Sequence, residues 1–140
     1  YFIGKYYCPD LDNNLSNYLH KFANTSMDIS DGLVSDMTKL INNQRLSFEL
    51  NLDKVPVSSY LSIFLKNFKI KKDKFITKGD DYKILFTASR SKRKYIQSLS
   101  KKMNQKVTII GNINNNKKNK ILFENKVKNL SNYLGYSHNF

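Results

Sequence analysis

The 140-residue chain has little cysteine, proline or glycine and no tryptophan. Its one cysteine, Cys8, excludes an internal disulfide, cannot form a metal site by itself, and is typical of the reducing cytoplasm. No stretch reaches the roughly 18 apolar residues of a membrane span, and the first residues lack the apolar run of a signal peptide. Because the first residue is Tyr1 rather than methionine, we expect a processed chain or a piece of a longer one.

Acidic residues are also scarce, with 11 Asp and Glu against 24 Lys and Arg and a formal net charge of +13. Such an excess can indicate nucleic-acid binding, because basic side chains neutralise phosphates. However, 21 of the 24 basic residues are lysine, and an Asn/Lys-rich segment covers 112–120. Nucleic-acid readers favour arginine and stacked aromatics, so we interpret the charge as a compositional bias and expect no nucleic-acid partner.

Apolar residues make up 40% of the chain, enough for one folded domain with a core. Helical and strand periods alternate and predict an α/β fold, a mixed sheet with helices packed on it. Helices are expected over 15–22, 33–41, 59–68 and 89–103, the third capped by Ser58 or Ser59. Strands are expected over 26–29, 47–52, 81–88 and 106–113, with a short strand or hairpin arm over 120–127.

Three of the 11 acids fall in "SMDISDGLVSDM", residues 26–37. Asp28 lies on the expected strand, Ser30 and Asp31 in a turn, and Gly32 where the chain bends into a helix. At the carboxyl end of a strand, Asp28 and Asp31 can converge on Mg²⁺, which prefers oxygen ligands and bridges to phosphates. Backbone N–H groups at the helix start, with the Ser30 hydroxyl, are then expected to meet phosphate oxygens.

The residues alone leave a structural alternative equally open. Ser30 or Asp31 can instead cap the helix that begins near Gly32. Asp36 is interpreted as a solvated or locally hydrogen-bonded helix residue rather than a ligand.

A second acidic segment, "TKGDDYKILFTA" at 77–88, places Asp80 and Asp81 after Gly79. Neighbouring residues of a strand face opposite ways, so only one of the two acids need point into a site. An ordinary turn before a strand explains the same residues. No nucleophile–base pair and no glycine-rich phosphate loop stands out, so no catalytic residue is predicted and phosphate chemistry would rest on metal and carboxylates.

Five segments, in order, resemble the C-terminal half of thiamine-monophosphate kinase. "SMDISDGLVSDM" is similar to that family's MDISDGL-x-x-D signature, "KGDDYKILFTA" to its GG[DE]DYELLFT stretch, and "GYSHNF" to its Gly-aromatic-x-His-Phe terminus. "LDKVPVS" and "IIGNI" resemble two further family segments. The matches run from about residue 25 to the end of the chain.

The resemblance implies the C-terminal domain fold of aminoimidazole ribonucleotide synthetase and an ATP- and Mg²⁺-dependent kinase that converts thiamine monophosphate to thiamine diphosphate. It implies that residues 1–140 form one C-terminal domain, that the N-terminal ATP- and metal-binding domain is absent from this chain, and that the complete protein is a homodimer. The chain alone is then expected to be inactive. By the same resemblance, Asp28 and Asp31 are Mg²⁺ ligands and Ser30 contacts ATP, whereas Asp80 contacts the thiamine substrate and Tyr136 packs against its aromatic part.

The sequence departs from the family pattern at three places. Lys78 replaces a glycine, Lys83 replaces a glutamate, and Asn139 is inserted between His138 and Phe140. Because two of these departures flank Asp80, the substrate prediction is affected more than the metal prediction. The alternatives are a sister enzyme, of the aminoimidazole ribonucleotide synthetase or selenophosphate synthetase type, and a non-catalytic basic binding module.

Overall fold

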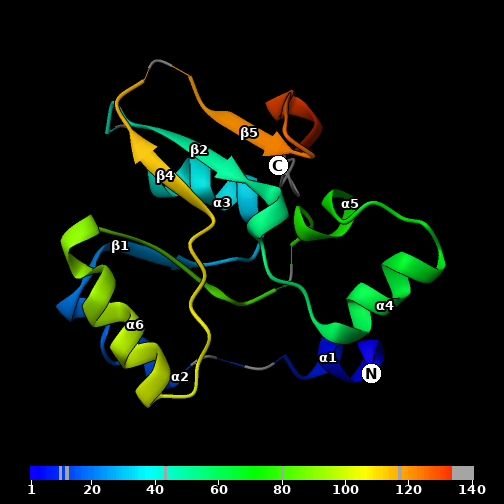
Figure 1. Cartoon of the computed structure of the whole chain (residues 1–140), viewed down its shortest axis with the longest axis horizontal. Coiled ribbons are helices and arrows are strands. Elements are labelled where there is room, and N and C mark those ends of the chain that lie inside the picture. Colours follow the sequence, from blue (N-terminus) through cyan, green and yellow to red (C-terminus); the bar gives the residue numbers. More distant parts are fainter. Residues whose placement is uncertain (10, 12, 43, 80, 117, 134–140) are drawn as a thin grey trace, which may run out of the picture.

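The strands form two sheets in the computed structural model, which describes residues 1–9, 11, 13–42, 44–79, 81–116 and 118–133 (Figure 1). An antiparallel ribbon joins β1 (Ala23–Asp28) to β3 (Ile84–Ala88). The second sheet has the order β4 (Gly111–Asn114), β2 (Ser47–Asn51), β5 (Lys120–Phe123) and β6 (Lys126–Lys128). Its β2–β5 pair is parallel and its other pairs are antiparallel, so the predicted α/β class with a mixed sheet is confirmed.

Helices pack on both sheets. Figure 1 shows α3 (Leu33–Leu40) behind β2 and α6 (Arg93–Lys102) beside the ribbon. The remaining elements are α1 (Phe2–Tyr7), α2 (Asn13–Ser16), α4 (Ser59–Asn67), α5 (Asp73–Ile76) and the 3₁₀ turns η1 (Leu19–Lys21), η2 (Leu52–Lys54), η3 (Arg90–Lys92) and η4 (Leu130–Tyr133). Within the described ranges, no helix is long and apolar enough to cross a membrane.

The main core lies between α3 and the four-stranded sheet. Phe48 and Leu50 of β2 and Leu52 of η2 face this core, and each is at most 1% exposed. Leu33 and Val34 of α3 are equally buried against it. Burying each such side chain contributes about 1.5–3 kcal/mol. These contacts hold α3 against the sheet, and with it the turn that precedes the helix.

The helix predicted over 15–22 is wrong as a single element. The structure has the short α2, then η1, and β1 begins at Ala23 directly after Phe22. The strand start leaves no room for a third helical turn, and Phe22 N–H bonds the carbonyl of Leu19 in a 3₁₀ pattern. Leu15 and Phe22 are nevertheless both buried, in a second cluster with Leu99 of α6.

The strand predicted over 106–113 is shorter than expected. Only Gly111–Asn114 is a strand, and the ladder gains one more bond, from Asn51 N–H to the Ile110 carbonyl at 2.8 Å. Because β2 turns into η2 at Leu52, residues 106–109 have no strand edge beside them there. In Figure 1 this segment instead runs across the ribbon on its way to β4.

The strand predicted over 81–88 is also shorter than expected, since β3 covers only Ile84–Ala88, and the helix predicted over 89–103 begins with the 3₁₀ turn η3. The remaining predicted elements are confirmed. Ser58 caps α4, because its hydroxyl oxygen accepts the N–H of Leu61 at 3.1 Å. Residues 120–128 form a β-hairpin, with Glu124 and Asn125 at positive φ (53° and 57°) as a two-residue turn requires.

Near the end of the described chain, Tyr133 ties η4 to α5. Its hydroxyl donates to Asp73 Oδ2 at 2.9 Å and the residue is 8% exposed. Burial, together with the hydrogen bond to Asp73, raises the pKa of Tyr133 to about 12. In the unfolded chain a tyrosine has a pKa of about 10, so the stability that this contact contributes is fully present below about pH 10 and is lost as pH rises through about 12.

We predict that Tyr133→Phe lowers the free energy of unfolding by about 1–3 kcal/mol at neutral pH, because it removes a hydrogen bond to a charged group. Between pH 10 and 12 the variant should lose stability less steeply than the wild type. Urea unfolding across that range measures both effects, with Tyr95→Phe, which removes an exposed hydroxyl, as the matched control. Parallel pH profiles for wild type and Tyr133→Phe would contradict the assignment.

Candidate metal and nucleotide site

The end of β1, the turn after it and the start of α3 form the candidate site. Along β1, Met27 faces the core and Asp28 is exposed on the other side. Ser30 and Asp31 lie in the turn, as predicted, and the Asp31 side chain is 19% exposed. Gly32 ends the turn at φ 117°, ψ 145°, a conformation that essentially requires glycine. These residues therefore lie on the segment and in the order that the sequence predicts.

Asp36 organises this turn from within the first part of α3. Its Oδ2 accepts the N–H groups of Ser30 at 2.9 Å, Asp31 at 3.0 Å and Gly32 at 3.2 Å. The side chain is completely buried. Hydrogen bonds to a charged group are each worth about 1.5–3 kcal/mol, and here they offset the desolvation of the carboxylate. The turn is thus held by a side chain that lies outside it.

Lys39 places a positive charge beside this turn. Its ammonium binds Asp31 Oδ2 and lies 3.2 Å from Asp36 Oδ1, so it bridges the two carboxylates. The hydrogen bond to Asp31, with the charge of Asp36, raises the pKa of Lys39 above its usual value against the opposing effect of burial. The lysine therefore stays charged at neutral pH, and the Asp31 carboxylate already binds a cation.

Two expectations about the turn are corrected by this geometry. The expectation that backbone N–H groups at the helix start meet phosphate is wrong for Gly32, because its N–H donates to Asp36, as do those of Ser30 and Asp31 in the turn. The capping alternative is also wrong, because the N-cap of α3 is Gly32 and no side chain caps it. Of the two interpretations of Asp36, local hydrogen bonding is confirmed and solvation is not.

The second acidic segment packs directly against the first. Tyr82 N–H donates to the Ile29 carbonyl at 2.9 Å, and Ile29 N–H donates to the Lys83 carbonyl at 3.0 Å. A Cβ at Gly79 would overlap the carbonyl oxygen of Ser30 and lie 3.0 Å from its carbon, so only glycine allows this approach. Two segments some 50 residues apart in the chain thus meet at one edge.

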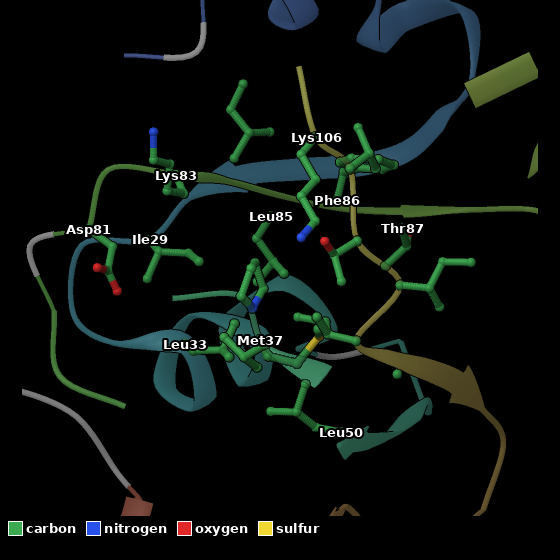
Figure 2. A pocket seen from close by; sticks show the side chains of 18 of the residues that line it. Ile29, Leu33, Met37, Leu50, Asp81, Lys83, Leu85, Phe86, Thr87 and Lys106 are labelled. Atoms are coloured by element: carbon green, nitrogen blue, oxygen red, sulfur yellow. The ribbon is translucent and has the colours of Figure 1, made fainter. Parts of the chain in front are cut away.

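The predicted substrate residues are less well placed. Asp80 and Tyr136 lie outside the described residues. Asp81 is described and exposed, and Figure 2 shows its side chain at one end of a cavity, near Ile29.

This cavity measures about 1480 Å³ and lies between the ribbon, α3 and the segment that leads to β4. Ile29, Leu33, Met37 and Leu85 form its apolar side, and Lys106 extends into it in Figure 2. It exceeds the roughly 300–1,000 Å³ of a usual small-ligand pocket. The volume therefore does not define one ligand, and of the turn at 28–32 only Ile29 lines this cavity.

The turn offers the type of ligand that Mg²⁺ prefers, but fewer ligands than complete its coordination. Asp28 and Asp31 offer the carboxylate oxygens that Mg²⁺ prefers, and Asp31 already attracts an ammonium ion. Among the residues that the structure describes, no three His, Cys, Asp or Glu side chains gather as a metal-binding cluster. Any remaining ligands must come from water, from substrate phosphates or from residues beyond this group.

Sequence reasoning missed the role of Asp36 and of Lys39. The signal was present: Asp36 falls three residues after Leu33 and four before Leu40, on the apolar stripe of the helix. A charged residue on a buried face requires partners, and the nearest backbone donors are those of the preceding turn.

Curated relatives match most of this chain. Thiamine-monophosphate kinase of Buchnera aphidicola subsp. Schizaphis graminum is 34% identical over 124 residues, which is 86% of this chain and 37% of that protein. The enzyme of the same name from Buchnera aphidicola subsp. Acyrthosiphon pisum is 30% identical over 122 residues, with the same coverage. The chain therefore spans little more than a third of the length of the curated relatives it matches. None of the protein-family models compared matches it.

Solved structures support the fold. The structure of AaThiL in complex with AMPPCP and TMP aligns with a TM-score of 0.71 at 25% identity, over 89% of this chain and 37% of that one. Thiamine-monophosphate kinase from Stenotrophomonas maltophilia K279a aligns with a TM-score of 0.68 at 24% identity, over 81% of this chain and 35% of that one. The expected fold, that of the aminoimidazole ribonucleotide synthetase C-terminal domain, is thereby confirmed.

We predict that Gly79→Ala lowers the free energy of unfolding by about 1–3 kcal/mol, because the added methyl group displaces the backbone of Ser30. Gly4→Ala is the matched control, since nothing lies within 4 Å of the position that its Cβ would take. Urea unfolding of both variants measures the difference. A Gly79→Ala midpoint equal to that of the wild type would show that the two acidic segments do not pack as described.

Proposed function

Because the chain belongs to the thiamine-monophosphate kinase family, we propose that residues 1–140 are the C-terminal domain of an ATP- and Mg²⁺-dependent kinase that phosphorylates thiamine monophosphate to thiamine diphosphate. The observation that carries this proposal is the turn at 28–32, where the Asp31 carboxylate pairs with the ammonium group of Lys39. Both curated relatives described above have the same enzyme name, so we do not propose a sister enzyme or a binding module.

Within this function, Asp28 and Asp31 hold Mg²⁺ and Ser30 contacts ATP. Support for Asp31 is its contact with the Lys39 ammonium, which must move away when a metal ion binds. Support for Asp28 is its exposed position at the end of β1, three residues before Asp31. When bound, Mg²⁺ neutralises charge on the transferred phosphoryl group, and the protein chiefly positions the reactants.

Recognition of thiamine monophosphate is assigned to Asp80 and Tyr136 on the resemblance of their segments alone. Gly79, which precedes Asp80 in the sequence, packs on the turn that carries the proposed metal ligands. Lys78 and Lys83, which replace the family's glycine and glutamate, are both exposed.

The complete kinase also needs parts that this chain does not supply. Mg²⁺ is usually held by one or two carboxylates together with water and substrate phosphates. As the family resemblance implies, we propose that an N-terminal domain adds further ligands and that the complete protein is a homodimer. We assign the reaction to the cytoplasm, where ATP is available. The 140-residue chain alone is then inactive.

The test is an assay of the complete protein that contains this chain, with ATP, Mg²⁺ and thiamine monophosphate. We predict formation of thiamine diphosphate, and a loss of at least about 100-fold in kcat for Asp31→Asn, because a metal ligand loses its charge. Glu124→Gln, which changes an exposed acid in the β5–β6 turn, should leave activity unchanged.

Circular dichroism of Asp31→Asn establishes that the fold is intact. Absence of thiamine diphosphate above background would contradict the kinase assignment. Near-normal turnover by Asp31→Asn would instead contradict only the metal role.

A further inference from the structure

The proposed function gives no role to Asp36, although it is a completely buried ionisable side chain next to the site. Its Oδ2 receives three consecutive amides within 2.9–3.2 Å. Successive N–H groups that converge on one negative atom form the kind of concavity that binds phosphates in other proteins. Here the anion is the protein's own carboxylate, so the concavity is occupied.

The opposite side of the turn's backbone is also engaged. In a trans peptide the C=O points away from the N–H of the following residue. The Ile29 carbonyl accepts the N–H of Tyr82, and the Ser30 carbonyl lies against Gly79. The turn is therefore held between Asp36 on its N–H side and Gly79 and Tyr82 on its C=O side, so a ligand would meet it through side chains.

Two of those side chains are carboxylates. Asp28 and Asp31 favour a cation, and Ser30 is the one hydroxyl between them that can reach a phosphate oxygen. Asp36 is linked to Asp31 twice, through the Asp31 amide at 3.0 Å and through the ammonium of Lys39, which both carboxylates bind. Moving Asp36 must therefore move Asp31.

We propose that Asp36 is a positioning residue of this site, which ties down the amides of Ser30, Asp31 and Gly32 so that the turn presents Asp31 to a divalent cation. The proposal rests on the proposed function and adds which groups of the turn bind the nucleotide. The ATP phosphates would be bound through the cation and the Ser30 hydroxyl, not through the amides of residues 30–32. For a phosphate to take them, the buried Asp36 carboxylate would lose its partners, which is costly.

The first experiment compares Mn²⁺ affinity by electron paramagnetic resonance titration of wild type, Asp36→Asn, Asp31→Asn and Thr38→Val. Asparagine is isosteric, but a neutral oxygen holds amides more weakly and its NH₂ group opposes the Lys39 ammonium. We expect Asp36→Asn to weaken Mn²⁺ binding by about 10-fold or more. Thr38→Val is the matched control, because it removes a hydrogen bond within the same helix, to the Val34 carbonyl at 2.8 Å, without touching the turn.

The second experiment uses only the wild type. In NMR spectra, the amides of residues 30–32 should exchange slowly with solvent and should not shift when inorganic phosphate is added. This measurement tests whether Asp36 occupies the three amides even where Asp36→Asn does not fold, since it needs no variant.

The outcomes separate the two proposals. Wild-type Mn²⁺ affinity in Asp36→Asn, together with loss of binding in Asp31→Asn, overturns the positioning role and leaves the proposed function standing. A saturable shift of the three amides with phosphate also overturns it. Unchanged binding in Asp31→Asn overturns the metal ligand of the proposed function itself, and the role of Asp36 falls with it.

Discussion

The structure around the site depends on one buried carboxylate and the three amides that it receives. Asp36 lies on the inner face of α3, where apolar neighbours hold the helix against the four-stranded sheet. Because the helix cannot rotate without exposing Leu33, Val34 and Met37, the position of the carboxylate is fixed by the core. The turn that precedes the helix then takes its shape from the carboxylate, and Gly32, at φ 117°, allows the backbone to follow.

The same turn joins the two halves of the candidate site. On its other side, Ile29 exchanges backbone hydrogen bonds with Tyr82 and Lys83, and Gly79 closely approaches Ser30. The core, the helix, the turn and the second acidic segment therefore form one continuous set of contacts. These contacts explain how a strongly basic chain keeps acidic residues together: three N–H groups stabilise the Asp36 carboxylate, and the Lys39 ammonium pairs with both Asp36 and Asp31.

Much of this architecture could be predicted from the sequence, because it follows from patterns. Alternation in β2, the period of α3 and the serine before α4 each specify a local structure with a clear apolar face or cap. The helix expected over 15–22 failed because β1 begins at Ala23, and the strand over 106–113 was cut short because β2 ends at Asn51. Both differences are caused by neighbouring elements, whose positions cannot be predicted from a local sequence pattern. The role of Asp36 was missed because residue spacing places it on the buried stripe of α3 but does not show where the three amides point.

If the turn at 28–32 is organised to receive a cation through its side chains, Mn²⁺ added at well below one equivalent should bind there. Paramagnetic broadening of backbone amide signals measures where the ion binds. We expect the signals of Asp28, Ser30 and Asp31 to broaden first. Earlier broadening at other acids, such as Glu49 or Glu124, or uniform broadening over the chain, would contradict it.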